Sequence, residues 1–321
     1  MKALCLVLAV GVCAGTATAG APPHRATDEA REVAFLIGEG TADSLATASL
    51  LTHLIDSGDA DKKPDSTVLI ERAVALAPRR PELLWLLLRD CELSRCAEEK
   101  AIAARLHSAD PDNGMASLPA LGASRAGPAS ETTRLLAEMG AAKYVRLYWN
   151  TLNVSMFDAL THGRKSKPAT ALTYAADDRL SHVAGVLAAV DIPPFKPILA
   201  VCAADQFAES GRREACESLM ARLDASDSII AQSLSVSVQQ KWWPAGSAEF
   251  KALQKKTLQQ HYLVEASGRA RGAQVDADAI MRVDAMRRLA TEEEVGKAML
   301  TAFREPLERP ADWEGAAPGG Q

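Results

Sequence analysis

Residues 66–85 read S-T-V-L-I-E-R-A-V-A-L-A-P-R-R-P-E-L-L-W, and residues 98–118 follow the same plan as E-E-K-A-I-A-A-R-L-H-S-A-D-P-D-N-G-M-A-S-L. In each copy an amphipathic stretch runs into a turn with a proline, Ala77-Pro78 and then Asp110-Pro111. A second apolar stretch follows each turn. This pattern predicts two successive helix-turn-helix units, and with them an all-α fold.

The two units resemble degenerate tetratricopeptide repeats. Pro78 and Pro111 match the terminal proline of that family, and they are 33 residues apart, close to its roughly 34-residue period. Ala73 matches the small position in the second helix of such a repeat. The chain departs from the family at Leu88, where a glycine is usual, and at Leu106, which is bulky at the position equivalent to Ala73. The resemblance implies an α-solenoid whose concave face binds another protein.

Helical periodicity continues beyond the two units, so we expect the solenoid to lead into further α-helical hairpins. One helix is predicted from Ser130 to about Leu160, with a break at Gly140, and a polar break is predicted over 163–170. Further helices are predicted over 176–190, 194–205, 211–224, 227–241, 247–266, 277–290 and 292–304. The expected organisation is a signal peptide (1–19), a disordered linker (20–27), a repeat region (28–162), a C-terminal α-helical region (171–304) and a disordered tail (305–321).

The N-terminus has the features of a secretory signal. Lys2 precedes an apolar run over 3–12 that is too short to span a bilayer, and the motif Ala17-Thr18-Ala19 predicts cleavage after Ala19, with Ala21 as the alternative site. No later stretch reaches the roughly 18 uninterrupted apolar residues of a membrane helix. We therefore expect an exported protein, periplasmic or secreted, with no integral membrane segment after cleavage.

Export changes how the cysteines are interpreted. Cys5 and Cys13 leave with the signal, and lipidation of Cys13 is the weaker alternative because Val12 before it is large. The four remaining thiols most simply form two disulfides in an oxidising compartment, and we favour the sequence-local pairs Cys91–Cys96 and Cys202–Cys216. A metal site built from all four cysteines competes with this interpretation, but neither pair has C-x-x-C spacing.

The charge balance is acidic. Removal of Lys2 with the signal leaves 35 basic and 41 acidic residues, so the formal charge changes from −5 to −6. A nucleic-acid-binding protein needs a basic face. We therefore expect no nucleic-acid partner, and the sequence does not indicate an oligomeric state.

The sequence contains no recognisable catalytic motif. Asp158 precedes His162 by one helical turn, and Asp178 precedes His182 in the same way. Either pair could hold a metal or orient a general base, although ordinary surface pairing explains both. His53 lies beside an apolar face and is expected to pack half-buried. We predict no cofactor and no metal, and the balance leans against an enzyme.

Two groups of aromatic residues are the best candidates for a binding site: Tyr144, Tyr148 and Trp149, and then Trp242 and Trp243. Packing between helices is the alternative role for all five. As ligand contacts they would supply the aromatic anchors that dominate interface hot spots.

The sequence thus favours an exported helical-repeat scaffold that binds a protein or peptide, in the groove of residues 28–121 or against the helix carrying residues 144–157. A helical hydrolase of the cell envelope and a carrier of a metal or small ligand are the alternatives.

The first testable prediction concerns the N-terminus and the cysteines. Intact mass spectrometry of the exported protein without reductant is expected to show a chain that begins at Gly20 and lacks four hydrogens. Peptide mapping should link Cys91 to Cys96 and Cys202 to Cys216. Four free thiols or a retained N-terminus would contradict the prediction.

Overall fold

The computed structural model describes residues 24–53, 55, 64–166, 176–190, 192–193, 195–268 and 275–313. Within these ranges every regular element is a helix, and the one strand-like pairing is an isolated bridge between Asn113 and Tyr144. The predicted all-α class is confirmed. The arrangement of these helices as a repeat solenoid remains a proposal.

The elements of the N-terminal part are α1 (His24–Glu39), α2 (Ala42–Thr52), α3 (Ser66–Leu76), α4 (Pro81–Ser94), α5 (Glu99–Ala109), the 3-10 helix η2 (Gly114–Ser117), α6 (Leu118–Ser124) and α7 (Ala129–Ala141). The elements that follow are α8 (Trp149–Ser166), α9 (Ala176–Val190), α10 (Lys196–Val201), the 3-10 helix η3 (Ala204–Ala208), α11 (Arg212–Asp224), α12 (Ile229–Gln240), α13 (Ala248–Gly268), α14 (Val275–Arg288) and α15 (Glu292–Phe303). Helices α9 and α11 to α15 lie where the sequence pattern predicts them, whereas the helix predicted over 194–205 is divided into α10 and η3.

Local signals in the sequence explain where several helices begin. The Asp65 carboxylate accepts the backbone N–H of Thr67 and so caps α3. Pro81 occupies the first turn of α4, where its missing N–H costs nothing. At α15, Thr291 and Glu294 bond reciprocally to each other's backbone N–H in the predicted capping box.

The two proline turns of the duplicated pattern share one backbone geometry. Ala77, at the end of α3, has φ −140° and ψ 67°, and Asp110, at the end of α5, has φ −141° and ψ 73°. The N–H of each residue donates to a carbonyl four residues earlier, that of Ala73 in the first turn and Leu106 in the second. The copies diverge afterwards, because α4 is continuous whereas η2 and the short α6 replace it in the second copy.

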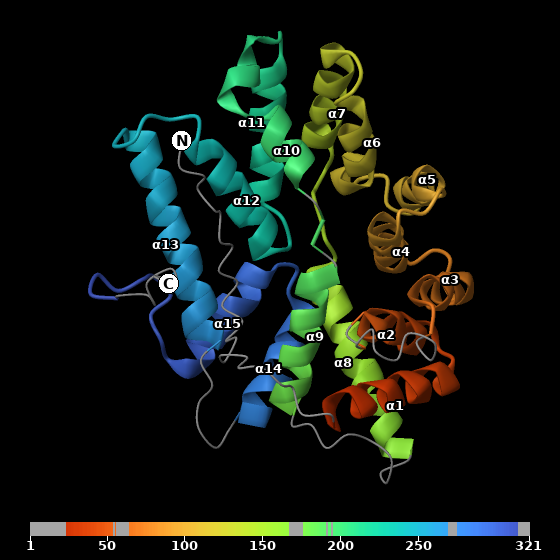
Figure 1. The fold of residues 1–321 in the computed structure, drawn as a ribbon. Helices are drawn as coiled ribbons and strands as arrows, with labels where there is room; N and C mark the ends of the chain where they lie inside the picture. Colours follow the sequence, from red (N-terminus) through yellow and green to blue (C-terminus); the bar gives the residue numbers. More distant parts are fainter. Residues whose placement is uncertain are drawn as a thin grey trace.

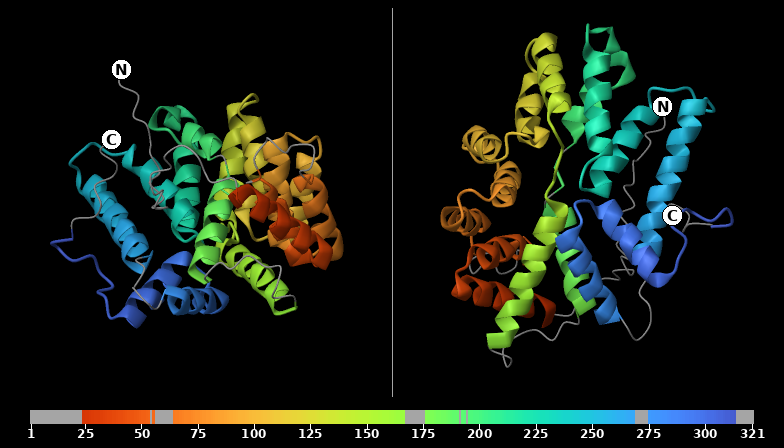
Figure 2. Two further views of the ribbon diagram at one scale, coloured as in Figure 1. Left: turned by 60° about the horizontal axis from the view of Figure 1, so that its bottom comes forward. Right: turned by 180° about the vertical axis from the view of Figure 1, so that it is seen from behind.

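The helices form a closed circuit of neighbours (Figures 1 and 2). Helices α1 to α7 pack one on the next along one side of the molecule, α7 packs on α11, and α11, α12 and α13 continue along the other side. Helix α13 packs on α15, α15 contacts α14, α14 contacts both α8 and α9, and α8 packs on α2, which closes the circuit. We refer to α1 through α7 as the N-terminal arc.

An extended stretch crosses the middle of this circuit and joins α7 to α8 (Figure 1). The break predicted at Gly140 is therefore found one residue later, but it is longer than expected: α7 ends at Ala141 and α8 begins only at Trp149. We call residues 143–148 the crossing segment. Val145 and Leu147 are fully buried on one side, whereas Arg146 between them is exposed. That alternation is typical of extended rather than helical backbone.

On one flank the crossing segment bonds to the loop between α5 and η2. The N–H of Tyr144 donates to the carbonyl of Asp112 (3.2 Å), and that of Gly114 donates to the carbonyl of Tyr144 (3.0 Å). The Asn113 amide replaces a neighbouring strand, because it accepts the N–H of Arg146 and donates to the Arg146 carbonyl, both at 3.1 Å. The crossing segment lies outside both helices, and these hydrogen bonds give its backbone N–H and C=O groups the partners that a helix would otherwise supply.

On the other flank the crossing segment bonds to a buried carboxylate. Asp227, in the loop before α12, accepts the N–H of Leu147 (2.8 Å) and that of Trp149 (3.2 Å), one with each oxygen. Tyr148 between them has a left-handed backbone with φ 59°, which costs a non-glycine residue roughly 1–2 kcal/mol. The hydrogen bonds from the crossing segment to Asn113 on one flank and to Asp227 on the other hold Tyr148 in this conformation.

Three predicted boundaries need correction. Helix α1 begins at His24, inside the predicted linker 20–27. Helix α8 extends to Ser166, so the predicted break over 163–170 begins within a helix, and residues 167–175 lie outside the described part.

The third correction concerns the predicted tail, 305–321, of which residues 305–313 are described. Its backbone packs on α13: the Tyr262 hydroxyl donates to the Pro306 carbonyl (2.7 Å), and the Trp313 ring contacts the Tyr262 ring edge-on at 5.6 Å. These contacts order the tail as far as Trp313.

Both cysteine pairs predicted from sequence lie at disulfide-bonding distance. Cys91 and Cys96 span the turn after α4 with a Cα–Cα distance of 4.9 Å. Cys202 and Cys216 join the end of α10 to α11 with a Cα–Cα distance of 5.7 Å.

The contact between α7 and α11 depends on a glycine and supplies a test of the fold. A Cβ on Gly140 would lie 2.8 Å from the Cβ of Ser218 and 2.9 Å from the backbone nitrogen of Leu219. We expect Gly140→Ala to lower the free energy of unfolding by about 1–3 kcal/mol, because α11 must move away. Urea denaturation followed by circular dichroism measures this.

The matched control is Gly185→Ala in α9, where an added Cβ meets nothing within 4 Å. It should be neutral or raise stability by up to about 1 kcal/mol, because alanine favours the helix. Equal destabilisation by both substitutions would contradict the close packing of α7 on α11.

Candidate functional site

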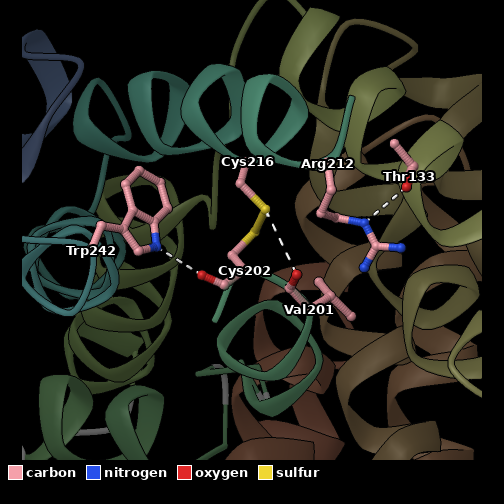
Figure 3. The surroundings of a disulfide bond; sticks show 6 residues. All are labelled: Thr133, Val201, Cys202, Arg212, Cys216 and Trp242. Carbon is pink, nitrogen blue, oxygen red and sulfur yellow. Dashed lines mark hydrogen bonds between the residues drawn. A yellow bond between two sulfur atoms is a disulfide. The ribbon is translucent and has the colours of Figure 1, made fainter. Parts of the chain in front are cut away.

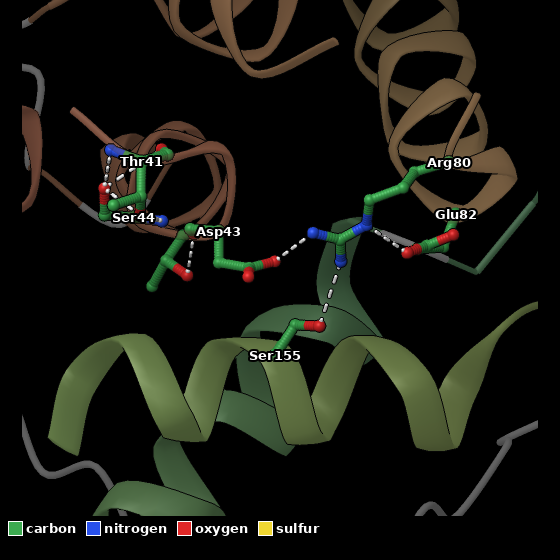
Figure 4. Close-up of polar contacts among 7 residues, drawn as sticks. Thr41, Asp43, Ser44, Arg80, Glu82 and Ser155 are labelled. Atoms are coloured by element: carbon green, nitrogen blue, oxygen red, sulfur yellow. Dashed lines mark hydrogen bonds and ion pairs between the residues drawn. The ribbon is translucent and has the colours of Figure 1, made fainter. Parts of the chain in front are cut away.

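The inner side of the N-terminal arc is bonded to the chain's own α8. Arg80, just before α4, donates to Asp43 of α2 (2.7 Å), to Glu82 (2.6 Å) and to the hydroxyl of Ser155 on α8 (3.3 Å; Figure 4). Desolvation opposes the charge of Arg80, but these two carboxylates outweigh it and raise the guanidinium pKa. A permanent cation therefore links α2, α4 and α8.

The two tyrosines of the crossing segment converge on one carboxylate of the arc. The Tyr144 hydroxyl donates to Oδ1 of Asp110 (2.5 Å), and the Tyr148 hydroxyl donates to Oδ2 (2.6 Å). The Tyr148 oxygen also accepts from Nδ2 of Asn113 at 3.0 Å. Burial first, and then the Asp110 carboxylate, raises the pKa of Tyr144 to about 12 and raises that of Tyr148 as well.

Two of the three aromatic residues predicted first as ligand contacts are therefore inside the molecule. Tyr148 and Trp149 are 7% and 6% exposed, and Tyr144 is half-buried. Asp110 belongs to the predicted groove of residues 28–121, and the two tyrosines bonded to it precede or begin the predicted binding helix. At this point the two predicted binding surfaces therefore contact each other. Asn153, in a potential glycosylation motif of the same helix, is fully buried.

The second predicted aromatic pair lies in a more accessible cluster. Trp242 and Trp243, at the end of α12, are half-buried, as is Phe207 of η3. Phe207 and Trp242 contact edge-to-face with ring centroids 5.4 Å apart. The guanidinium carbon of Arg213 lies 5.7 Å from the ring centroids of both Phe207 and Trp243, within the range of a cation–π contact. We call these four residues the aromatic–arginine surface.

The Cys202–Cys216 disulfide positions this surface (Figure 3). The Trp242 indole N–H donates to the carbonyl of Cys202 at 2.8 Å, which ties the end of α12 to the disulfide. Nearby, the buried Arg212 donates to the Thr133 hydroxyl (2.8 Å) and so anchors the start of α11 on α7. The surface is thus held by covalent and hydrogen bonds on a rigid support.

Arg213 is half exposed and also pairs with Glu217 one turn along α11 at 2.9 Å. Sequence reasoning identified the two tryptophans but missed Phe207 and Arg213. Phe207 lies 36 residues and Arg213 lies 30 residues before Trp243 in the sequence, and no local pattern connects them to it.

A polar cluster gathers around the buried Asp90 of α4. One oxygen accepts from Nε2 of His53 (3.0 Å) and from the Ser66 hydroxyl (2.8 Å), and the other accepts from the Thr67 hydroxyl (2.6 Å). Burial disfavours the charged form of Asp90, but these hydrogen bonds outweigh it and lower the pKa of the carboxyl group. Both hydroxyls donate to the carboxylate rather than to His53, so the cluster ties α2, α3 and α4 together instead of forming a nucleophilic relay.

The histidine pairs singled out in the sequence fall largely outside the described side chains. Those of His162, Asp178 and His182 are not described, whereas Asp158 forms an ion pair with Arg287 of α14. Among the side chains that are described, no group of three or more His, Cys, Asp or Glu residues could hold a metal ion.

No protein family, curated protein or solved structure matches this chain. None of the described helices is long and apolar enough to cross a membrane.

The tyrosine pair on Asp110 supplies a second test. Tyr148→Phe removes a buried hydroxyl and leaves both Asp110 and Asn113 short of one partner. We expect it to lower the free energy of unfolding by about 1–3 kcal/mol. Tyr144→Phe should cost less, because water can replace the lost partner at a half-buried hydroxyl. Urea denaturation compares the two variants, and an equal or larger cost for Tyr144→Phe would contradict this account.

Proposed function

We propose that this chain is an exported helical-repeat scaffold that binds a protein or peptide through the aromatic–arginine surface. The carrying observation is the cluster of Phe207, Arg213, Trp242 and Trp243, which is partly open to solvent and held by a disulfide-bonded support.

The repeat part of the proposal is supported by the two proline turns. Their equal backbone angles at Ala77 and Asp110 are what a duplicated helix-turn-helix unit would have. The serial packing of α1 through α7 has the neighbour-on-neighbour order of repeat proteins. Export is supported by the N-terminal signal pattern and by the two cysteine pairs at bonding distance.

Two arguments support this location for the binding site: the residue types that it contains, and the burial of the other aromatic candidates. Tryptophan and arginine are the residues most enriched in interface hot spots. Tyr148 and Trp149 are both buried, and the Tyr148 hydroxyl is bonded to Asp110, so they present little surface to a partner. Arg213 is exposed and Trp243 is half-buried beside it, so a partner could cover the ring and the guanidinium together.

Binding can be tested with the oxidised mature protein as bait in an extract of the cell envelope. The captured partner is identified by mass spectrometry, purified, and titrated by calorimetry against the wild type, Trp243→Ala and Arg213→Ala. Each substitution is expected to weaken binding at least about tenfold, which corresponds to roughly 1.4 kcal/mol or more.

Leu93→Ala is the matched control, because Leu93 is a large apolar residue on α4 with 51% of its surface exposed. Its partner affinity should equal that of the wild type. Unchanged binding by Trp243→Ala and Arg213→Ala would place the site elsewhere. Capture no better than that of the reduced, unfolded bait would count against the scaffold function itself.

A further inference from the structure

Residues 305–313, which we call the tail loop, lie beside α13 and are held there through their backbone (Figure 1). Gln259 of α13 bonds to this backbone twice: Nε2 donates to the carbonyl of Leu307, and Oε1 accepts the N–H of Arg309, both at 2.8 Å. An amide side chain that pairs with a C=O and an N–H in this way recognises main chain rather than a particular side chain. Peptide-binding surfaces obtain affinity from main-chain hydrogen bonds of this kind.

Three residues further along α13, Tyr262 contacts both ends of the tail loop. Its hydroxyl donates to the carbonyl of Pro306 (2.7 Å), and its ring meets the ring of Trp313 edge-on with centroids 5.6 Å apart. Trp313 packs against a small apolar cluster of α13 and α15, separate from the main core, that contains Tyr262, Leu263, Ala266 and Leu300. The indole is therefore the anchor of the loop, because a large aromatic ring contributes most of the energy in such a contact.

The tail loop is also closed on itself. The N–H of Trp313 donates to the carbonyl of Pro310 (3.1 Å), and Nη1 of Arg309 donates to the carbonyl of Trp313 (3.3 Å). The Arg309 guanidinium carbon lies 5.9 Å from the centre of the indole ring. Arg309, Pro310 and Trp313 are half-buried, whereas residues 306–308, 311 and 312 are exposed. The side chains that this face can select are thus an arginine, the proline after it, and a tryptophan three positions after the proline.

We propose that this face of α13 is a peptide-binding site, which the tail loop occupies as a resident ligand and from which a partner peptide of the same chemistry displaces it. The partner peptide carries the pattern Arg-Pro-x-x-Trp, and its backbone just before and at the arginine pairs with Gln259. The site shares no residue with the aromatic–arginine surface, so each proposal stands or falls without the other.

The tail loop is suited to displacement. None of residues 305–313 is buried, and its hydrogen bonds to α13 come from the side chains of Gln259 and Tyr262. Segments with few buried apolar contacts open locally at a low free-energy cost. Because the loop belongs to the same chain, its effective concentration at the site is about millimolar. A partner peptide must therefore compete with the loop, which acts as an autoinhibitory contact.

The probe for this site is a fluorescein-labelled, C-terminally amidated peptide with the sequence of residues 305–313, E-P-L-E-R-P-A-D-W. It is titrated by fluorescence anisotropy into the full wild-type chain and into full-length Trp313→Ala, which removes the anchor of the resident loop and leaves α13 unchanged. We expect the dissociation constant to be at least about tenfold lower for Trp313→Ala, because the wild-type loop competes with the probe. A probe with alanine in place of its tryptophan should not bind.

Gln259→Ala, combined with Trp313→Ala, locates the site. It removes both hydrogen bonds to the peptide backbone and is expected to weaken binding of the probe at least about tenfold. The matched control is Gln254→Ala in the same background, because Gln254 is exposed on the same helix five residues earlier. Its affinity for the probe should equal that of Trp313→Ala alone.

Circular dichroism and thermal unfolding establish that each variant is folded. Arg309→Ala is the second variant of the loop: it removes the guanidinium contacts but keeps the ring on Tyr262, and it should raise the affinity for the probe by a smaller factor than Trp313→Ala.

A probe that binds neither folded loop variant more tightly than the wild type would overturn the proposal. So would equal weakening by Gln259→Ala and Gln254→Ala. Sedimentation velocity of the wild type separates the remaining occupant: a dimer that the probe dissociates would mean that the loop of a second copy fills the site, and it would overturn the assignment of the resident ligand to the same chain.

Discussion

The crossing segment depends on side chains that replace backbone partners. An extended stretch between two helices leaves its N–H and C=O groups unpaired, and such groups are costly when buried. Asn113 satisfies the segment on one flank, and the carboxylate of Asp227 satisfies it on the other. Because Asp227 lies before α12 and Asn113 lies after α5, these two residues also decide how the two sides of the helical circuit are held together.

The same constraint explains why the N-terminal arc does not present an open inner face along its whole length. Arg80 bonds to Ser155 of α8, and Asp110 receives the hydroxyls of Tyr144 and Tyr148. Aromatic residues that could anchor a foreign peptide thus anchor the chain to itself. These tyrosines are used to pack the chain on itself, so the half-buried aromatic residues at the end of α12 become the better candidates for contact with a partner.

The aromatic–arginine surface depends on interactions that hold it to the rest of the fold. The Cys202–Cys216 pair joins α10 to α11, and the Trp242 indole N–H donates to the carbonyl of Cys202. The end of α12 is thereby tied to α10 and α11.

The sequence by itself determined the all-α class, the starts of helices such as α3, α4 and α15, and the two cysteine pairs. Periodicity, the cap at Asp65 and the capping box at Thr291 act within a few residues, so they can be read locally. Only the tertiary structure decided that residues 143–148 are extended and that Trp243 is half-buried while Trp149 is buried. The partner of Leu147 lies 80 residues away in the chain, and no local pattern carries information over that separation.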